Sequence, residues 1–398
     1  MAPSMGKKGK NIFPSFDDGD VEIKLSETPK DVYILHSFVL ALHSPFFKTS
    51  LSERWAASGD TALIVPGSKI RWKYELRFEE KSNLAILTRD QGVPPEDSSK
   101  TELLTKTTAA LAHTDESALF TERQSVVSTH RQLLGLFYTI PPKYEPTFEA
   151  TKTAIVRLVS LADMYTCTPI TTMAVENLLY SFMPTILNAC HTTPTAMISL
   201  ATEVKSTWIF KEAATHLIGF CVEDFEKLEG ELKELHLLKY FQHARSELRI
   251  GLMVVEQLLF VTPYTTNAGM SGRLYTLFRE FLSVSIRGGK GSGMKRGYAQ
   301  LYHQVANGEW VKSSTWASLL RQHNLLASPG VFPTNSLSNH KGDTSAILQG
   351  VLKNCTRLKK APGTSDGLTC IEVDDKNLPW NLEDVSKPHS TLEDLFKD

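Results

Sequence analysis

Histidines and carboxylates are the side chains of this chain that could do acid–base or metal chemistry, so their spacing is informative. His36 and His43 lie seven residues apart in one predicted helix, a spacing that does not suit a single metal ion. A core imidazole is therefore the favoured interpretation of His36. Asp20 and Asp163 form a catalytic carboxylate pair only as a remote alternative. We predict no catalytic residue and no metal ligand.

Two further features could suggest chemistry. The glycine-rich stretch 287–297 lacks the G-x-x-x-x-G-K-[ST] spacing of a phosphate loop, and a flexible linker is the favoured interpretation. Cys221 lies in an apolar segment and is interpreted as a core residue rather than a nucleophile. The motif sets of serine hydrolases, zinc proteases and kinases are missing from the sequence. We therefore expect no enzyme activity, no cofactor and no small-molecule substrate.

Charge and cysteine usage limit the partners that we expect. The chain of 398 residues has a net charge of −1, which gives no overall electrostatic footprint for nucleic acid. Short basic runs at 7–10 and 290–296 leave weak nuclear-import or nucleic-acid patches as an alternative to a solvated tail and linker. The five scattered cysteines argue against a disulfide framework and favour a reducing compartment, the cytoplasm or the nucleus.

Membrane partners are not expected either. The longest apolar run, at 250–261, is shorter than the roughly 20 residues that a membrane span needs. The first residues contain a small basic run without the apolar segment of a secretory signal. The sequence therefore predicts a soluble protein.

Alternating apolar residues predict strands in the N-terminal part. Residues 21–25 and 32–35 favour a β-hairpin, and a further strand is expected at 61–65. The clearest alternation lies at 72–78, followed by a return strand at 84–87. The aromatic face of this second hairpin is interpreted as facing the core. The alternative is an exposed edge that binds a partner strand.

Helical patterns surround and follow these strands. Residues 36–43 are apolar nearly all round, which is typical of a helix buried on more than one side. Ser44 and Pro45 are a favoured N-cap and first helical residue, so a second short helix is expected there. The chain after residue 184 predicts several helices and no strand. Examples of these predicted helices are 195–205, 210–222, 232–241 and 247–260.

Five short motifs occur in one order along the first half of the chain. They are a strand that begins Asp-Val, a His-x-x-x-Leu-Ala helix, a Ser-x-x-Phe turn, and two helices ending in Phe-Tyr-Thr and Leu-Ala-Asp-x-Tyr. Together they resemble the signature of BTB/POZ domains, and the long second hairpin resembles fungal members. The signature residues are Asp20, His36, Leu40, Ser44, Phe47, Tyr138, Ala162, Asp163 and Tyr165. Ser37 departs from the pattern, because a basic residue often stands there in transcriptional repressors of the family.

The resemblance implies an α+β fold in which helices flank a small sheet, followed here by an all-helical C-terminal region and a flexible tail. It covers 17–183 and includes a long insertion around 48–130, within which 89–116 is expected to be mobile. The divisions that we predict are a flexible N-terminus at 1–16, a BTB/POZ domain at 17–183, a helical domain at 184–286, and a linker with a largely disordered tail at 287–398.

The resemblance also implies a function in protein–protein interaction. Family members commonly form homodimers through the first helix, so we expect interaction residues at Phe38, Val39, Leu42 and Phe46. Several members recruit cullin-class ubiquitin ligases, which makes a substrate adaptor the first functional hypothesis. The alternative is a nuclear transcription or chromatin scaffold, although no zinc-finger or basic-zipper pattern is visible. The sequence names no partner or client.

Overall fold

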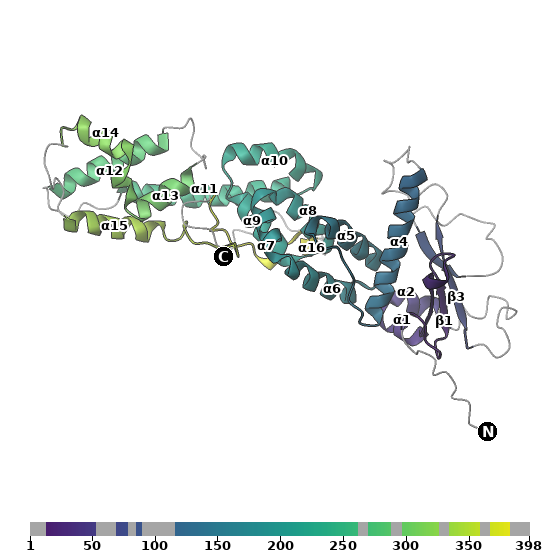
Figure 1. Ribbon diagram of the computed structural model, residues 1–398. Helices are drawn as coiled ribbons and strands as arrows, with labels where there is room; N and C mark the ends of the chain where they lie inside the picture. Colours follow the sequence, from purple (N-terminus) through teal and green to yellow (C-terminus); the bar gives the residue numbers. More distant parts are fainter. Residues whose placement is uncertain are drawn as a thin grey trace, which may run out of the picture. The chain divides into compact units, whose positions relative to one another are not determined.

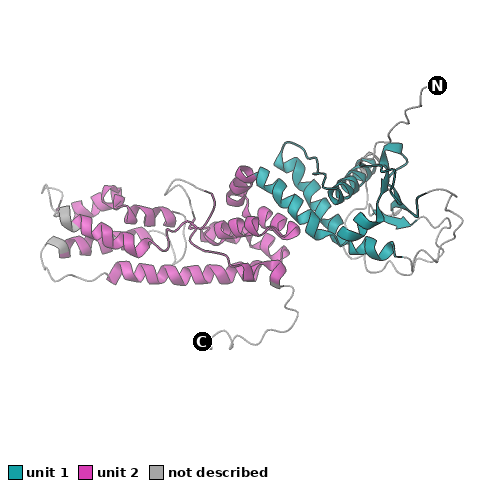
Figure 2. Cartoon of the chain, turned by 90° about the horizontal axis from the view of Figure 1, so that it is seen from below, with its two compact units in different colours: residues 1–182 teal, residues 183–398 magenta. Residues whose placement is uncertain are grey.

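The chain is described by a computed structural model in eight segments, which are residues 13–52, 69–78, 85–89, 116–261, 270–287, 297–325, 334–358 and 367–382. The described residues form a mixed α+β structure, with a small sheet at the N-terminal end and helices after it (Figure 1). The chain divides into two compact units, residues 1–182 and 183–398 (Figure 2). The predicted order of a small sheet followed by an all-helical region is confirmed.

The sheet of unit 1 has four strands in the order β2-β1-β3-β4. These strands are β1 (Val21–Lys24), β2 (Val32–Leu35), β3 (Trp72–Phe78) and β4 (Ala85–Arg89). Both predicted hairpins form, because β1 pairs antiparallel with β2 and β3 pairs antiparallel with β4. The two hairpins join through β1 and β3, which run parallel.

The positions of β3 and β4 in the sheet bear on the two interpretations of the second hairpin. Strand β3 pairs with β1 on one side and with β4 on the other, so it is an interior strand. Trp72, Tyr74 and Leu76 are buried on one face. The core-facing interpretation is confirmed for these three side chains. The alternative of an exposed edge is wrong for β3 only, because β4 of the same hairpin is the last strand of the described sheet. The strand predicted at 61–65 lies outside the described residues, as does nearly all of the expected mobile insertion.

Helices of unit 1 pack beside the sheet. The bounds of these helices are α1 (Ser37–His43), α2 (Pro45–Ser50), α4 (Glu116–Phe137), α5 (Phe148–Met164) and α6 (Thr168–Ser181). Helices α4, α5 and α6 pack on one another, and α1 contacts both α2 and α4. The predicted start of a helix at Ser44 and Pro45 is confirmed, because the Ser44 side chain accepts a hydrogen bond from the Phe47 N–H.

The N-terminal residues correct one prediction. A flexible segment is expected at 1–16, but Phe13 and Phe16 pack their rings near Tyr138, with centroids 5.6 and 5.0 Å away. The Pro14 carbonyl also accepts a hydrogen bond from the Ile34 N–H. Aromatic side chains bury a large apolar area, which fixes this short segment against β2. Residues 1–12 lie outside the described residues.

Unit 2 is helical throughout its described residues. The helices are α7 (Met183–Thr192), α8 (Pro194–Val204), α9 (Thr207–Ile218), α10 (Val222–Glu234), α11 (Leu238–Val261), α12 (Met270–Arg287), α13 (Tyr298–Ala306), α14 (Ser314–Gln322), α15 (Thr334–Leu348) and the short α16 (Pro379–Leu382). The helix predicted at 232–241 is wrong. His236 adopts a left-handed conformation with φ of 58°, which separates α10 from α11.

The prediction of a linker and disordered tail at 287–398 is wrong for most of the described residues in that range. Helix α13 packs on α15, and Trp310, Trp316 and His340 are buried. Two tryptophans in a polar stretch bury enough apolar area to replace a regular apolar pattern, which is why periodicity failed to reveal this core. The predicted domain boundary between residues 286 and 287 is also wrong, because it separates α12 from α14, and these helices pack together in unit 2.

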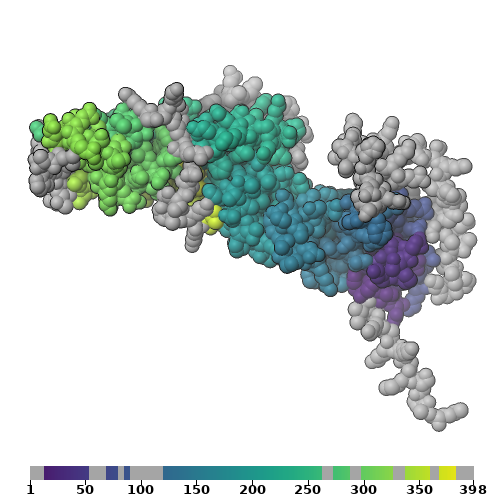
Figure 3. Space-filling model, turned by 45° about the horizontal axis from the view of Figure 1, so that its top comes forward, coloured from purple at the N-terminus to yellow at the C-terminus, as the bar shows by residue number. Residues whose placement is uncertain are grey.

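In the space-filling view, residues 297–325 form part of the green surface of unit 2 (Figure 3). The contact between α11 and α13 is polar, because the hydroxyls of Tyr298 and Tyr302 both donate to the same Glu256 oxygen, at 3.0 and 2.8 Å. A glycine allows a second close approach, since a Cβ at Gly219 would overlap the Leu368 carbonyl oxygen. These contacts tie late segments of the chain to earlier helices of the same unit.

Candidate protein-interaction surface

Helix α1 is held at its N-terminus by the signature aspartate. Asp20 precedes β1, and its two carboxylate oxygens accept hydrogen bonds from the Ser37 N–H at 2.7 Å and the Ser37 hydroxyl at 2.6 Å. A carboxylate that accepts an N–H of the first turn satisfies a donor that the helix itself leaves unpaired. Ser37, which departs from the family pattern, thus has a local role as a partner of Asp20.

The signature histidine fixes the chain where it enters the same helix. His36 precedes α1, and its N–H donates to the Tyr138 hydroxyl at 2.9 Å. The His36 imidazole lies 3.1 Å from an Asp18 oxygen and packs on Phe16. His36 is therefore a partly buried residue that connects β2, α1 and the end of α4. Its imidazole has hydrogen-bond partners, but the core position that the sequence favoured is wrong, because the side chain is 27% exposed.

A second group of signature residues is centred on Tyr165, at the end of α5. The Ser44 hydroxyl donates to the Tyr165 carbonyl at 2.6 Å, and the Phe47 ring stacks on the Tyr165 ring with centroids 5.7 Å apart. The Tyr165 hydroxyl in turn accepts the Leu87 N–H of β4 at 3.1 Å. Leu40 and Ala162 are fully buried. Two of the motifs therefore meet around one tyrosine.

Asp163 is the exposed member of the signature. Its carboxylate accepts a hydrogen bond from the Thr168 hydroxyl at 2.8 Å, which ties the end of α5 to the start of α6. Asp20 caps a different helix, so the two aspartates act separately on backbone geometry. The remote alternative of a catalytic pair has no support in these contacts.

The interaction residues predicted on α1 and α2 fall into two groups. Phe38 is 74% exposed and Leu42 is 65% exposed, whereas Val39 and Phe46 are half-buried. Phe38 and Leu42 are four residues apart, so they lie on the same side of the helix. We call these two residues the α1 face. The prediction that α1 is buried on more than one side is wrong for this face. Only the opposite side of the helix, which carries the buried Leu40, packs against the unit.

Phe46 belongs to a separate groove on unit 1. This groove has a volume of about 590 Å³, and its lining includes Phe46, Tyr74, Leu87 and Arg89. It is shallow and mostly apolar, without a cluster of titratable side chains. Its lining therefore indicates no chemistry beyond packing.

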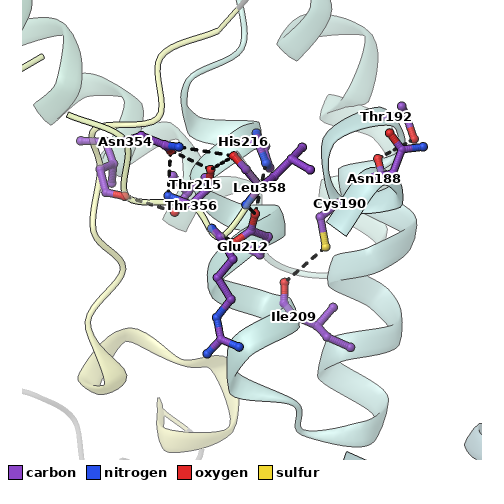
Figure 4. Close-up of polar contacts among 12 residues, drawn as sticks. Asn188, Cys190, Thr192, Ile209, Glu212, Thr215, His216, Asn354, Thr356 and Leu358 are labelled. Atoms are coloured by element: carbon purple, nitrogen blue, oxygen red, sulfur yellow. Dashed lines mark hydrogen bonds and ion pairs between the residues drawn. The ribbon is translucent and has the colours of Figure 1, made fainter. Parts of the chain in front are cut away.

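A buried polar cluster in unit 2 is a feature that sequence patterns do not predict (Figure 4). Glu212 of α9 is buried, and its carboxylate accepts the backbone N–H groups of Arg357 and Leu358 at 2.8 and 3.0 Å. His216 Nε2 lies 3.5 Å from the same carboxylate, one helical turn later. Burial alone would raise the pKa of Glu212, but these partners outweigh burial and hold it below its ordinary value.

Cys190 and Cys221 are buried cysteines of unit 2, and the pKa of each thiol indicates whether it could act as a nucleophile. Burial raises the pKa of the Cys190 thiol far above its ordinary value, and its sulfur contacts the Ile209 carbonyl. Burial likewise raises the pKa of Cys221 to about 11. Both thiols are protonated at neutral pH and poorly nucleophilic. The core interpretation of Cys221 is confirmed by its 2% exposure. The Glu212 carboxylate, described above, anchors residues 354–358 through the backbone N–H groups that it accepts.

Arg245 of α11 is the second buried charge that sequence patterns missed. Its guanidinium donates to the carbonyls of Ile218, the last residue of α9, and Phe220, just after that helix, at 2.8 and 2.7 Å. It also lies over the Phe225 ring, 4.1 Å from the centroid. Burial lowers the pKa of Arg245 to about 10, which leaves it charged at neutral pH. A lone arginine in a helix has no sequence signal that distinguishes it from a surface residue.

The described residues contain no group of three His, Cys, Asp or Glu side chains that could hold a metal ion. Within the same residues, no helix is long and apolar enough to cross a membrane. Comparison of the chain with family models, curated proteins and solved structures found no match.

Proposed function

We propose that this chain is a protein-interaction protein of the BTB/POZ type that self-associates through the α1 face. The supporting observation is the combination of a rigidly positioned α1 with Phe38 and Leu42 left in solvent. Asp20 fixes the start of the helix, and Leu40 anchors its inner side. Such a face is arranged for binding because its apolar side chains are fixed in place before a partner arrives.

The physical reason for self-association is the exposed apolar area. Phe38 and Leu42 together with half-buried Val39 leave apolar carbon in water, where burial would stabilise by about 25 cal/mol per Å². A two-fold dimer lets one patch meet its own copy, so a single surface suffices.

Sedimentation equilibrium of the full chain tests the proposal. Phe38→Asp and Leu42→Asp place a charge on the α1 face, and each is expected to lower the mass of the assembly. Burial of an unpaired charge in an interface is strongly unfavourable, so the dissociation constant should rise at least about a hundredfold. Circular dichroism checks that the variants fold.

Met173→Asp is the matched control. Met173 lies on α6 and is 71% exposed, close to the exposure of Phe38, but it stands apart from α1 in sequence. This control should leave the mass unchanged. A wild-type chain that stays monomeric at high micromolar concentration would contradict the proposal, as would α1 variants that assemble like the wild type.

A role as adaptor for a cullin-class ubiquitin ligase is the more specific proposal. Its support is the BTB/POZ resemblance, together with the helices that follow residue 183. A pull-down with purified cullin scaffold, using the full chain at tens of micromolar, tests it. Retention of the scaffold supports the adaptor role, and no retention would leave a dimeric scaffold as the better account.

A further inference from the structure

Helix α11 is the longest helix of the described residues, and its two sides differ. Its inner side buries Phe241, Arg245, Leu248, Leu252 and Leu259 within unit 2. Its outer side carries large apolar residues that are between 50% and 62% exposed. These residues, which we call the α11 stripe, are Ile250, Met253, Val254, Leu258 and Val261. The last four follow Ile250 by three, four, eight and eleven residues, which places all five along one side of the helix.

The order of residues in the α11 stripe is nearly the same in both directions. Reversal about the midpoint of 250–261 exchanges Ile250 with Val261 and Met253 with Leu258. A second copy of α11, lying antiparallel, would therefore bring an apolar residue opposite each of these four. Two-fold interfaces require this property, because residue i meets residue j while j meets i.

Charges on α11 do not oppose such a pairing. Glu256 is the single charged residue between 250 and 261, and it is engaged on the inner side by the hydroxyls of Tyr298 and Tyr302. At the centre of the antiparallel pair, Val254 would face Gln257, whose amide side chain carries no charge. Two copies therefore meet without like charges, whereas a strongly charged partner would find no complementary group on the stripe.

The exposed area is sufficient for association. Five side chains at these exposures present on the order of 500 Å² of apolar surface, which is at the upper range of patches on monomeric proteins. Two copies would bury about 1,000 Å² from the stripe alone, near the lower limit of a specific interface. The exposed residues beside the stripe add to that area.

We propose that the α11 stripe is a second self-association surface, in which two copies of α11 pair antiparallel with Ile250 opposite Val261. This surface is distinct from the α1 face and does not depend on it. A chain with two different two-fold surfaces assembles beyond a dimer, because each copy can contact two others.

Charge exchange across the pair tests the antiparallel register. Ile250→Lys and Val261→Glu each place a charge against an apolar residue and should raise the dissociation constant at least about tenfold. The double variant brings each lysine opposite the glutamate of the other copy, so association should return. Within one chain these positions are about 16 Å apart along the helix, too far to pair with each other.

The measurement is sedimentation equilibrium of the full chain carrying Leu42→Asp, which removes any contribution of the α1 face. In this background we expect a dimer, dissociated by each single α11 variant and recovered by the double variant. Val284→Lys is the control, since Val284 of α12 is 48% exposed and outside the stripe. It should leave the dimer intact.

Results that differ from this expectation would contradict either the α11 stripe as a self-association surface or the antiparallel register of the pair. A monomer in the Leu42→Asp background, or single variants without effect, would exclude the α11 stripe as a self-association surface. Dissociation without recovery in the double variant would exclude the antiparallel register. The α1 proposal is judged separately, by whether Leu42→Asp alone lowers the mass of the wild-type assembly.

Discussion

Each unit of the chain is stabilised internally by polar contacts, and the residues that make these contacts differ in kind between the units. In unit 1, signature side chains such as Asp20 and Ser44 bind backbone groups at the starts and ends of helices. In unit 2, the buried charges of Glu212 and Arg245 bind backbone groups at the end of α9 and in residues 354–358. Both units therefore use side chains to satisfy orphan backbone groups, but only unit 1 does so with residues in a recognisable pattern.

This difference has a physical origin. The Ser44 cap is local, because Ser44 stands directly before α2, and this part of unit 1 is readable from sequence, whereas Asp20 is 17 residues from its partner Ser37. Glu212 and Arg357 are 145 residues apart, and neither is marked by its neighbours. Unit 2 is consequently expected to depend more heavily on single buried residues than unit 1 does.

The largest effect is expected at Arg245. Arg245→Ala leaves the carbonyls of Ile218 and Phe220 without their donor, and it should lower the free energy of unfolding by about 3 kcal/mol or more. Urea unfolding followed by circular dichroism measures this change. Lys239→Ala, at an exposed position on the same helix, should shift stability by less than about 0.5 kcal/mol. Equal effects of the two variants would contradict the dependence of unit 2 on the buried Arg245.

Acid should destabilise unit 2 through His340. This imidazole is fully buried beside the rings of Tyr275, Phe278 and Trp310, and burial lowers its pKa from 6.5 to about 4. The unfolded chain binds the proton more tightly, so the stabilisation is fully present above pH 6.5 and is lost as pH falls from 6.5 towards 4. The loss amounts to about 3 kcal/mol.

His340→Phe should flatten this pH dependence while keeping an aromatic ring in the site. The measurement is the urea midpoint between about pH 7 and pH 4.5, which spans most of the titration. His130 of unit 1 also has a pKa lowered to about 4 by burial, so wild-type unit 1 has its own acid response. If the units unfold separately, His340→Phe changes only the transition of unit 2. An unchanged slope in that transition would refute the assignment.

The cap of α1 should contribute less than the buried arginine of unit 2. Asp20→Ala removes both hydrogen bonds to Ser37 and should cost about 1–2 kcal/mol, measured by thermal unfolding. Glu27→Ala removes only an exposed ion pair with Lys24 and should cost less than about 0.5 kcal/mol. A cost at Asp20 above that of Arg245→Ala would reverse the comparison.

The smallest effect is expected at Gly230 of unit 2, and Gly219 of the same unit provides the contrast. Gly230 is exposed in α10, and a Cβ added there would meet no neighbouring atom within 4 Å, so Gly230→Ala should stabilise by about 0.5–1 kcal/mol. Gly219→Ala should instead destabilise, because its Cβ would overlap the Leu368 carbonyl oxygen. Thermal unfolding of both variants shows whether residues 367–368 pack against the end of α9 in solution. Stabilisation by both substitutions would contradict that packing.

Sequence patterns predicted the strands of unit 1 and the cap at Ser44, because alternation and capping are local properties. They also predicted apolar residues on α1, and the structure identifies Phe38 and Leu42 as the exposed pair. A short helix around 316–326 was predicted and overlaps α14, but α13 and α15 were missed because Trp310 and Trp316 bury a core without regular spacing. The break at His236 was missed because a left-handed histidine has no strong sequence signal.

Hydroxyl-radical footprinting at increasing protein concentration tests the central claim, self-association through the α1 face, most directly. The oxidation rate of each side chain reports its exposure in solution, and Met173 provides an internal reference with nearly the exposure of Phe38. If the α1 face self-associates, oxidation of Phe38 falls as concentration rises while that of Met173 stays constant. Constant oxidation of Phe38 up to high micromolar concentration would contradict the claim.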